Sequence, residues 1–162
     1  MPDFSEFPKI VSAGVRSPRK YHLITSHFAV HGVPSQAGSG PVMEFAPEKI
    51  AVYPIARFAQ MREKGRETSP VYSLQPEGLL AVPTGRVFVR MRSDIKFADH
   101  GRDFHDAGYE IDQTLPYAPN AGWLHSSSFS IASSLAGLDR LCSIAGVENV
   151  EPQMLQQAVR KA

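Results

Sequence analysis

The stretch Arg86-Val87-Phe88-Val89-Arg90-Met91-Arg92 alternates between two kinds of side chain. Val87, Val89 and Met91 fall on one side of an extended chain, and Phe88 falls on the other side together with the arginines. Successive side chains of a β-strand point to opposite faces of its sheet. This period of two therefore predicts a strand with one buried face, and the other elements are placed relative to it.

Helical and extended patterns alternate in the residues that follow this strand. Gly108 and Gly146 stand where helices are expected to end, Pro116 breaks a strand, and Ser126–Ser128 supply candidate caps for the second helix. The predicted order is strand, helix, strand, strand, helix, strand, over residues 86–92, 97–107, 109–115, 122–125, 131–144 and 147–151.

This order predicts an α+β fold for residues 84–155. We expect a ferredoxin-like βαββαβ arrangement, in which two helices stack on one face of a four-stranded antiparallel sheet and leave the other face open. Residues 1–83 are predicted to form a loop-rich N-terminal extension with a hairpin over Val42–Phe45 and Ile50–Tyr53, and residues 156–162 a C-terminal tail.

The composition excludes several classes of protein. The formal net charge of the 162 residues is +1 at pH 7, which gives no basic field for nucleic acid or an anionic membrane. The N-terminal residues do not resemble a secretory signal, and no stretch approaches the ~18 apolar residues of a membrane helix. The single cysteine, Cys142, excludes an internal disulfide and a cysteine-built metal site. A cytoplasmic protein is predicted.

Several motifs of the second half, taken in order, resemble the prodomains of subtilisin-like proteases. They are VFVRM at 87–91, AGYEI at 107–111, PNAGWL at 119–124 and, most clearly, LDRLCSIAGVENVEP at 138–152. The resemblance does not extend into residues 1–83. It implies a non-enzymatic inhibitor and folding chaperone, supplied as a separate molecule, that forms a one-to-one complex with a subtilisin-like serine protease and needs no cofactor.

The resemblance also implies two sets of contact residues. The open sheet face, with Phe88, Arg90 and Glu151, would lie against two surface helices of the protease, where a carboxylate caps exposed N–H groups. Gln153 occupies a second capping position that is often acidic in the family. The C-terminal residues would pass through the substrate cleft with Val159 nearest the catalytic serine. These residues are Met154, Leu155, Gln156, Gln157, Ala158 and Val159.

Other interpretations of the same residues stay open. The predicted order of elements also suits an RNA-recognition module, although residues 121–125 lack its aromatic signature, or a small-molecule regulatory domain. Glu151 is equally interpretable as a solvated strand charge, and Trp123 as a packing residue. The histidines show no metal-site spacing, and the serines at 126–130 fit a capping turn better than a catalytic site.

Overall fold

The computed structural model describes residues 2–32, 40–62 and 66–156. The strands are β1 (Ile10–Ser12), β2 (Lys20–His31), β3 (Met43–Phe45), β4 (Ile50–Pro54), β5 (Thr68–Gln75), β6 (Leu79–Met91), β7 (Tyr109–Thr114), β8 (Ala121–Ser126) and β9 (Val147–Gln156). The helical segments are the 3-10 turns η1 (Ile55–Arg57) and η2 (Phe97–His100) and the helices α1 (Phe58–Arg62), α2 (Gly101–Asp106), α3 (Ile131–Ala136) and α4 (Leu138–Cys142).

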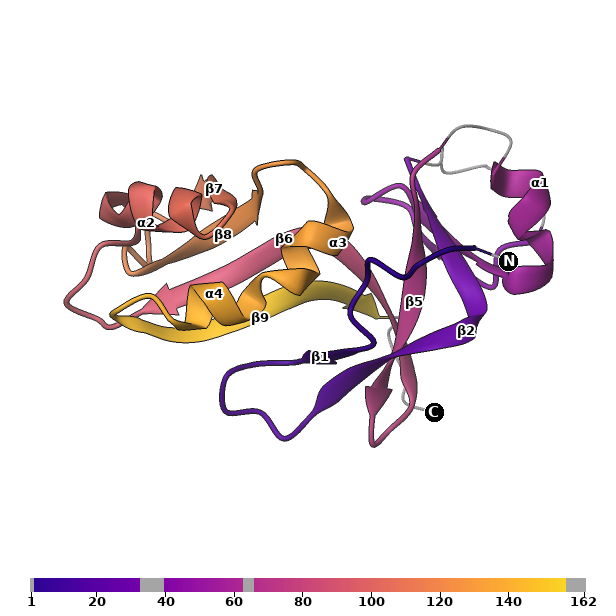
Figure 1. The fold of residues 1–162 in the computed structure, drawn as a ribbon, viewed down its shortest axis with the longest axis horizontal. Coiled ribbons are helices and arrows are strands. Elements are labelled where there is room, and N and C mark those ends of the chain that lie inside the picture. Colours follow the sequence, from indigo (N-terminus) through magenta and orange to yellow (C-terminus); the bar gives the residue numbers. More distant parts are fainter. Residues whose placement is uncertain (1, 33–39, 63–65, 157–162) are drawn as a thin grey trace.

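Within these residues, the nine strands form one antiparallel sheet. Its main path is β3-β4-β2-β5-β6-β8-β7, with β1 added to β2 and β9 added to β6. Figure 1 shows that β7, β8 and α2 lie in one half of the molecule and β2, β5 and α1 in the other. Strands β6 and β9 run through the region where the halves meet.

Strand β6 belongs to both halves of the sheet. Its first residues pair with β5, where Ala81 stands opposite Tyr72, and its later residues pair with β8, where Phe88 stands opposite Trp123. Strand β9 follows β6 along both parts, from the Val89–Val150 pair to the Ala81–Gln156 pair. The two halves are therefore connected by two hydrogen-bonded strands and not by a linker.

A bulge bends β6 at the junction. Thr84, Gly85 and Arg86 stand between the pairs Pro83–Met154 and Val87–Pro152, whereas β9 has only Gln153 there. Gly85 has φ +93°, a left-handed conformation that glycine adopts without strain. Thr84 Oγ1 donates a hydrogen bond of 2.7 Å to Gln153 Oε1 across the bulge. Such bulges increase local twist, so β6 changes direction without losing its partner.

The ferredoxin-like fold predicted for residues 84–155 is wrong. The strands of that region are not a separate four-stranded sheet, because β6 begins at Leu79 and β9 continues to Gln156, and both pair beyond the predicted limits. The predicted boundary at residue 83 lies inside β6. Residues 1–83 are not a loop-rich extension either, since their described part contains β1 to β5. The hairpin predicted at residues 42–53 is confirmed by the pairing of β3 with β4.

The helix expected over residues 97–107 is present as η2 followed directly by α2, whereas the second predicted helix is interrupted. The helix expected over residues 131–144 is divided at Gly137 into α3 and α4. A Cβ atom at Gly137 would lie 2.6 Å from Tyr109 Oη, so the chain approaches β7 too closely for any other residue. Ser130, and not Ser126–Ser128, caps α3 by accepting a hydrogen bond from the Ser133 N–H. Phe104 of α2 and Leu141 of α4 are fully buried against Val87, Val89 and Leu124.

The first-half strands curl around an apolar interior of their own. Met43 of β3 and Leu155 of β9 pack against the same interior, although these strands are far apart in the order of the sheet. Its buried members are Ala29, Met43, Ile50, Val52, Val71 and Val82. Phe28, Val30 and Tyr53 belong to a separate cluster on the opposite face of β2 and β4, so both faces of the sheet are covered in this half.

A half-buried histidine makes the stability of this fold depend on pH. His31 on β2 has its Nε2 atom 2.9 Å from Ser69 Oγ, and burial lowers its pKa from 6.5 to about 4. The folded chain therefore favours the neutral imidazole, whereas the unfolded chain binds a proton below about pH 6.5. Stability is fully present above pH 6.5 and falls as the pH decreases towards 4, by about 2–3 kcal/mol from this residue.

We predict that His31→Gln, which keeps a donor for Ser69, reduces this pH dependence. The free energy of unfolding should be measured by urea denaturation of both chains at pH 7 and pH 4.5. The loss between the two pH values should be smaller in the variant by about 2 kcal/mol. Equal losses in the two chains would contradict the role of His31, because the other titrating groups are common to both.

Candidate protein-binding surface

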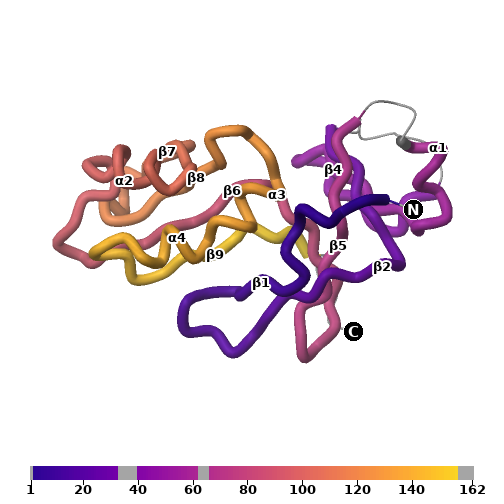
Figure 2. Tube along the Cα trace, viewed as in Figure 1, coloured from indigo at the N-terminus to yellow at the C-terminus, as the bar shows by residue number. Residues whose placement is uncertain are grey.

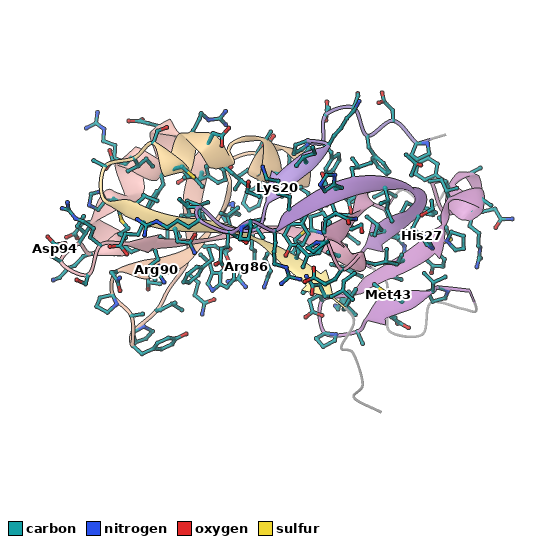
Figure 3. All side chains as sticks on the ribbon, turned by 90° about the horizontal axis from the view of Figure 1, so that it is seen from below. Lys20, His27, Met43, Arg86, Arg90 and Asp94 are labelled. Atoms are coloured by element: carbon teal, nitrogen blue, oxygen red, sulfur yellow. The ribbon has the colours of Figure 1, made fainter. Side chains whose placement is uncertain are left out.

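The face of β6, β7, β8 and β9 opposite α2 and α4 carries a group of large side chains, which we call the open face. Strand alternation determines which side chains lie on this face. Val87, Val89 and Leu124 point into the core beneath the helices. The intervening residues point the other way, and Figure 3 shows Arg86 and Arg90 along β6 with the helices on the far side of the sheet. The open face comprises Arg86, Phe88, Arg90, Trp123, His125, Phe129 and Glu151.

The centre of the open face is aromatic. Phe88 and Trp123 are directly opposite each other on β6 and β8, with ring centroids 5.3 Å apart in an edge-to-face arrangement. The guanidinium of Arg86 lies 4.5 Å from the centroid of the Trp123 ring. Phe88 and Trp123 are each partly exposed. Aromatic pairs and cation–π contacts of this kind fix the rings, so the surface is ordered before any partner binds.

The open face contains two arginines, both on β6, and each is paired with an acidic side chain. Arg86 Nε lies 2.9 Å from Asp112 Oδ2, and its Nη2 donates to Gln113 Oε1 on β7. Arg90 Nε lies 3.8 Å from Glu148 Oε2 on β9, and both side chains are about half exposed. These pairs leave little uncompensated positive charge on the open face, and the contacts of Arg86 with Asp112, Gln113 and Trp123 orient its guanidinium.

Glu151 stands beside Phe88 at the edge of the open face. It is exposed, and its Oε1 accepts a hydrogen bond of 2.8 Å from Asn149 Nδ2. Asn149 Oδ1 in turn accepts a hydrogen bond from the Val15 N–H, in the loop after β1. The carboxylate is thus oriented but keeps acceptor capacity for a partner. A polar hollow of about 360 Å³ next to it is lined by residues that include Arg16, Arg90 and Glu148.

At the other end of β8, Phe129 extends the aromatic surface. Its ring stacks on His125, with centroids 4.3 Å apart and an interplanar angle of 17°. Phe129 remains 74% exposed, and its backbone φ is +60°, in the left-handed region that costs a residue with a Cβ atom about 1–2 kcal/mol. An exposed aromatic side chain held in a strained conformation contributes little to folding, and such residues concentrate at functional sites.

Hydrogen bonding also perturbs two titratable groups on β7 and α2. The Glu110 carboxylate, opposite His125 on β8, is held below its usual pKa mainly by its hydrogen bond to His105, and the same contact raises the pKa of His105. Both groups are exposed, so the pair adds local order more than stability.

The structure brings together some of the sequence-predicted contact residues and separates others. Phe88, Arg90 and Glu151 share the open face. The Gln153 side chain is bonded to Thr84, at the bulge. Met154, Leu155 and Gln156 belong to β9, paired with residues 81–83 of β6, and not to a free tail. Gln157, Ala158 and Val159 lie outside the described residues.

Several members of the open face were not among the predicted contact residues. Strand alternation over residues 121–126 places Trp123 and His125 on one side, and this signal was available in the sequence. As expected for a packing residue, Trp123 packs against Phe88, and it is also partly exposed. The sequence does not indicate the left-handed conformation of Phe129. Turn positions with positive φ are usually occupied by glycine or asparagine, and not by an aromatic residue.

Neither a metal site nor a membrane helix is found in the described part of the chain. No group of three or more histidine, cysteine, aspartate or glutamate side chains there could hold a metal ion. None of the described helices is long and apolar enough to cross a membrane.

We predict that Phe129 can be removed at little cost to folding. Phe129→Gly relieves the left-handed strain, which offsets the lost stacking and the added entropy of the unfolded chain. The matched control is Tyr117→Gly, because Tyr117 is 84% exposed but has no positive φ. In urea denaturation, Phe129→Gly should be more stable than Tyr117→Gly by about 1–2 kcal/mol. Equal destabilisation would mean that Phe129 serves the fold.

Comparisons with known proteins do not identify this surface. No family model, curated protein or solved structure matches the chain.

Proposed function

We propose that the chain inhibits a separately encoded subtilisin-like serine protease and assists its folding. In the proposed one-to-one complex, the open face docks on the protease surface and the C-terminal residues enter the substrate cleft. The observation that carries the proposal is the ordered pair of Phe88 and Trp123 in the middle of an open sheet face. The resemblance of residues 138–152 to protease prodomains supplies the class of partner.

The chemistry of the open face supports a protein partner. Protein interfaces have an apolar, aromatic centre surrounded by polar groups that stay partly hydrated. Here Phe88 and Trp123 form the centre, and the Arg90–Glu148 pair and Glu151 form the edge. Aromatic residues fixed in advance lose little entropy on binding, which favours a tight complex.

Single-stranded RNA is the alternative occupant of this face. Phe88 and Trp123 lie side by side on neighbouring strands, as bases would require for stacking. Arg86 already covers one face of the Trp123 ring, however, and both Arg86 and Arg90 are paired with carboxylates. Phosphate binding needs unpaired cations, so these contacts favour a protein over RNA. The small-molecule regulatory interpretation has no corresponding feature on the open face.

The position of β9 limits which C-terminal residues are free to enter a cleft. Met154 packs against the core that contains Tyr21 and Leu135, and Leu155 packs against the interior around Val82. Withdrawing them would expose both cores. We therefore propose that the segment for the cleft begins after Gln156, and that Glu151 and Phe88 supply the sheet contact. From the sequence expectations, we further propose that the complex forms in the cytoplasm.

We predict that substitutions on the open face weaken inhibition without unfolding the chain. Phe88→Ala should raise the inhibition constant against a subtilisin-like protease by about tenfold, because aromatic residues at interface centres contribute more than 1 kcal/mol. Glu151→Gln should raise it about threefold by removing charge from a helix-capping contact. Arg102→Ala, on the exposed surface of α2, is the control and should inhibit like wild type. Circular dichroism verifies folding.

Two results would reject parts of this proposal. Wild-type inhibition by both Phe88→Ala and Glu151→Gln would exclude the open face as the docking surface. Failure of the full chain to inhibit any member of a panel of subtilisin-like proteases at micromolar concentration would reject the function itself.

We predict a separate effect of the C-terminal residues. A chain that ends at Gln156 keeps β9 and both cores, so it should unfold at the same urea concentration as the full chain. It should nevertheless lose competitive inhibition by tenfold or more if the later residues occupy the cleft. Competition between each chain and a peptide substrate measures this directly. Equal inhibition by the two chains would leave the sheet contact as the source of affinity and contradict the cleft assignment.

A further inference from the structure

A second surface feature lies in the half of the molecule that carries α1. A cavity of about 320 Å³ opens between the N-terminal segment and β2. Figure 2 shows this segment, in indigo, running from β1 to the N-terminus beside β2 and α1. The cavity is independent of the open face and of its proposed partner, since the two share no residues.

The cavity arises from a break in the pairing of β2 with β5. Thr25, Ser26 and His27 stand between the pairs Ile24–Val71 and Phe28–Pro70, whereas β5 has no residue between positions 70 and 71. Pro70 has no N–H to donate to the ladder, which explains why the strands separate there. The extra residues bend β2 and leave space beside Leu23 and Ile24.

The outer wall of the cavity is held by specific contacts. The Phe4 ring packs edge-to-face against Phe7 at 5.6 Å and against Phe58 of α1 at 6.2 Å. Tyr72 Oη donates a hydrogen bond of 2.7 Å to the Pro8 carbonyl. The Leu23 N–H donates to the Lys9 carbonyl at 2.8 Å. The wall is therefore attached to β2, β5 and α1, and the cavity exists without a ligand.

The lining combines apolar side chains with a lysine and a histidine. Its apolar members, all partly exposed, are Phe4, Phe7, Leu23, Ile24 and Ile55. Its titratable members are Lys9 and His27, and no carboxylate lines the cavity. Within the described residues Lys9 forms no salt bridge. The Nδ1 atom of His27 lies 2.8 Å from Ser26 Oγ, which orients the ring.

We propose that this cavity binds a small apolar monocarboxylate, such as a medium-chain fatty acid. The hydrocarbon lies against Leu23, Ile55 and the phenylalanines, and the carboxylate pairs with the ammonium of Lys9, which lines the cavity. The volume is at the lower end of the range for small-molecule sites, which excludes large ligands. A partly exposed apolar concavity with a few convergent polar groups is the usual form of such a site.

The test measures octanoate binding to the full chain by isothermal titration calorimetry. Lys9→Gln should weaken octanoate binding at least fivefold, because it removes the charge partner, and should leave 1-octanol binding unchanged. Lys20→Gln is the matched control, since Lys20 is exposed on β2 and does not line the cavity. Both lysines are exposed, so neither variant should unfold. Octanoate should also shift the methyl NMR signals of Leu23 and Ile55.

Three outcomes would overturn the proposal. They are the absence of octanoate binding at millimolar concentration, equal weakening by Lys9→Gln and Lys20→Gln, and methyl shifts confined to other residues. The second outcome would mean that the anion responds only to overall charge. The experiment does not measure protease inhibition, so its result tests the cavity independently of the proposed function.

Discussion

The pairing of β6 with β9 is the constraint on which the rest of the structure depends. Each strand passes from one half of the molecule to the other, and their hydrogen bonds continue on both sides of the bulge at residues 84–86. Because the core face of β6 is buried at Val87, Val89 and Met91, a shift of register by a single residue would expose these side chains. The bulge allows a change of direction while this register is kept, and Gly85 supplies the conformation that it needs.

The same pairing gives the open face its rigidity. Phe88 and Glu151 face each other across β6 and β9, and Phe88 and Trp123 across β6 and β8. The positions of these side chains are fixed by backbone hydrogen bonds and not by loops, which reduces the entropy lost on docking. Phe129 differs because a strained turn holds it out from the sheet. The surface thus combines a rigid aromatic centre with one exposed aromatic residue in a left-handed turn conformation.

The sequence predicts local elements of this chain better than their assembly. The alternation in residues 86–92 correctly indicates a strand with Val87 and Val89 buried, and it separates Phe88 and Arg90 from the core. Pro83-Thr84-Gly85 has the composition of a loop between two domains, but here it lies inside β6, where Thr84 and Gly85 belong to the bulge. Pairing between β5 and β6 is a tertiary contact with no local signature, so the continuous sheet was missed. The division of the helix at Gly137 depends on Tyr109 of β7, and sequence periodicity does not report such an approach.

The most direct test of the docking claim uses the single tryptophan of the chain. Trp123 lies on the open face, and 5-fluorotryptophan labelling of this chain alone gives one fluorine NMR signal that the protease does not share. The account predicts that a catalytically inactive subtilisin-like protease shifts or broadens this signal, with saturation at one equivalent. Binding of the wild-type protease is established separately by its inhibition. If the Trp123 signal then stays unchanged at saturation, the result contradicts the docking of this face.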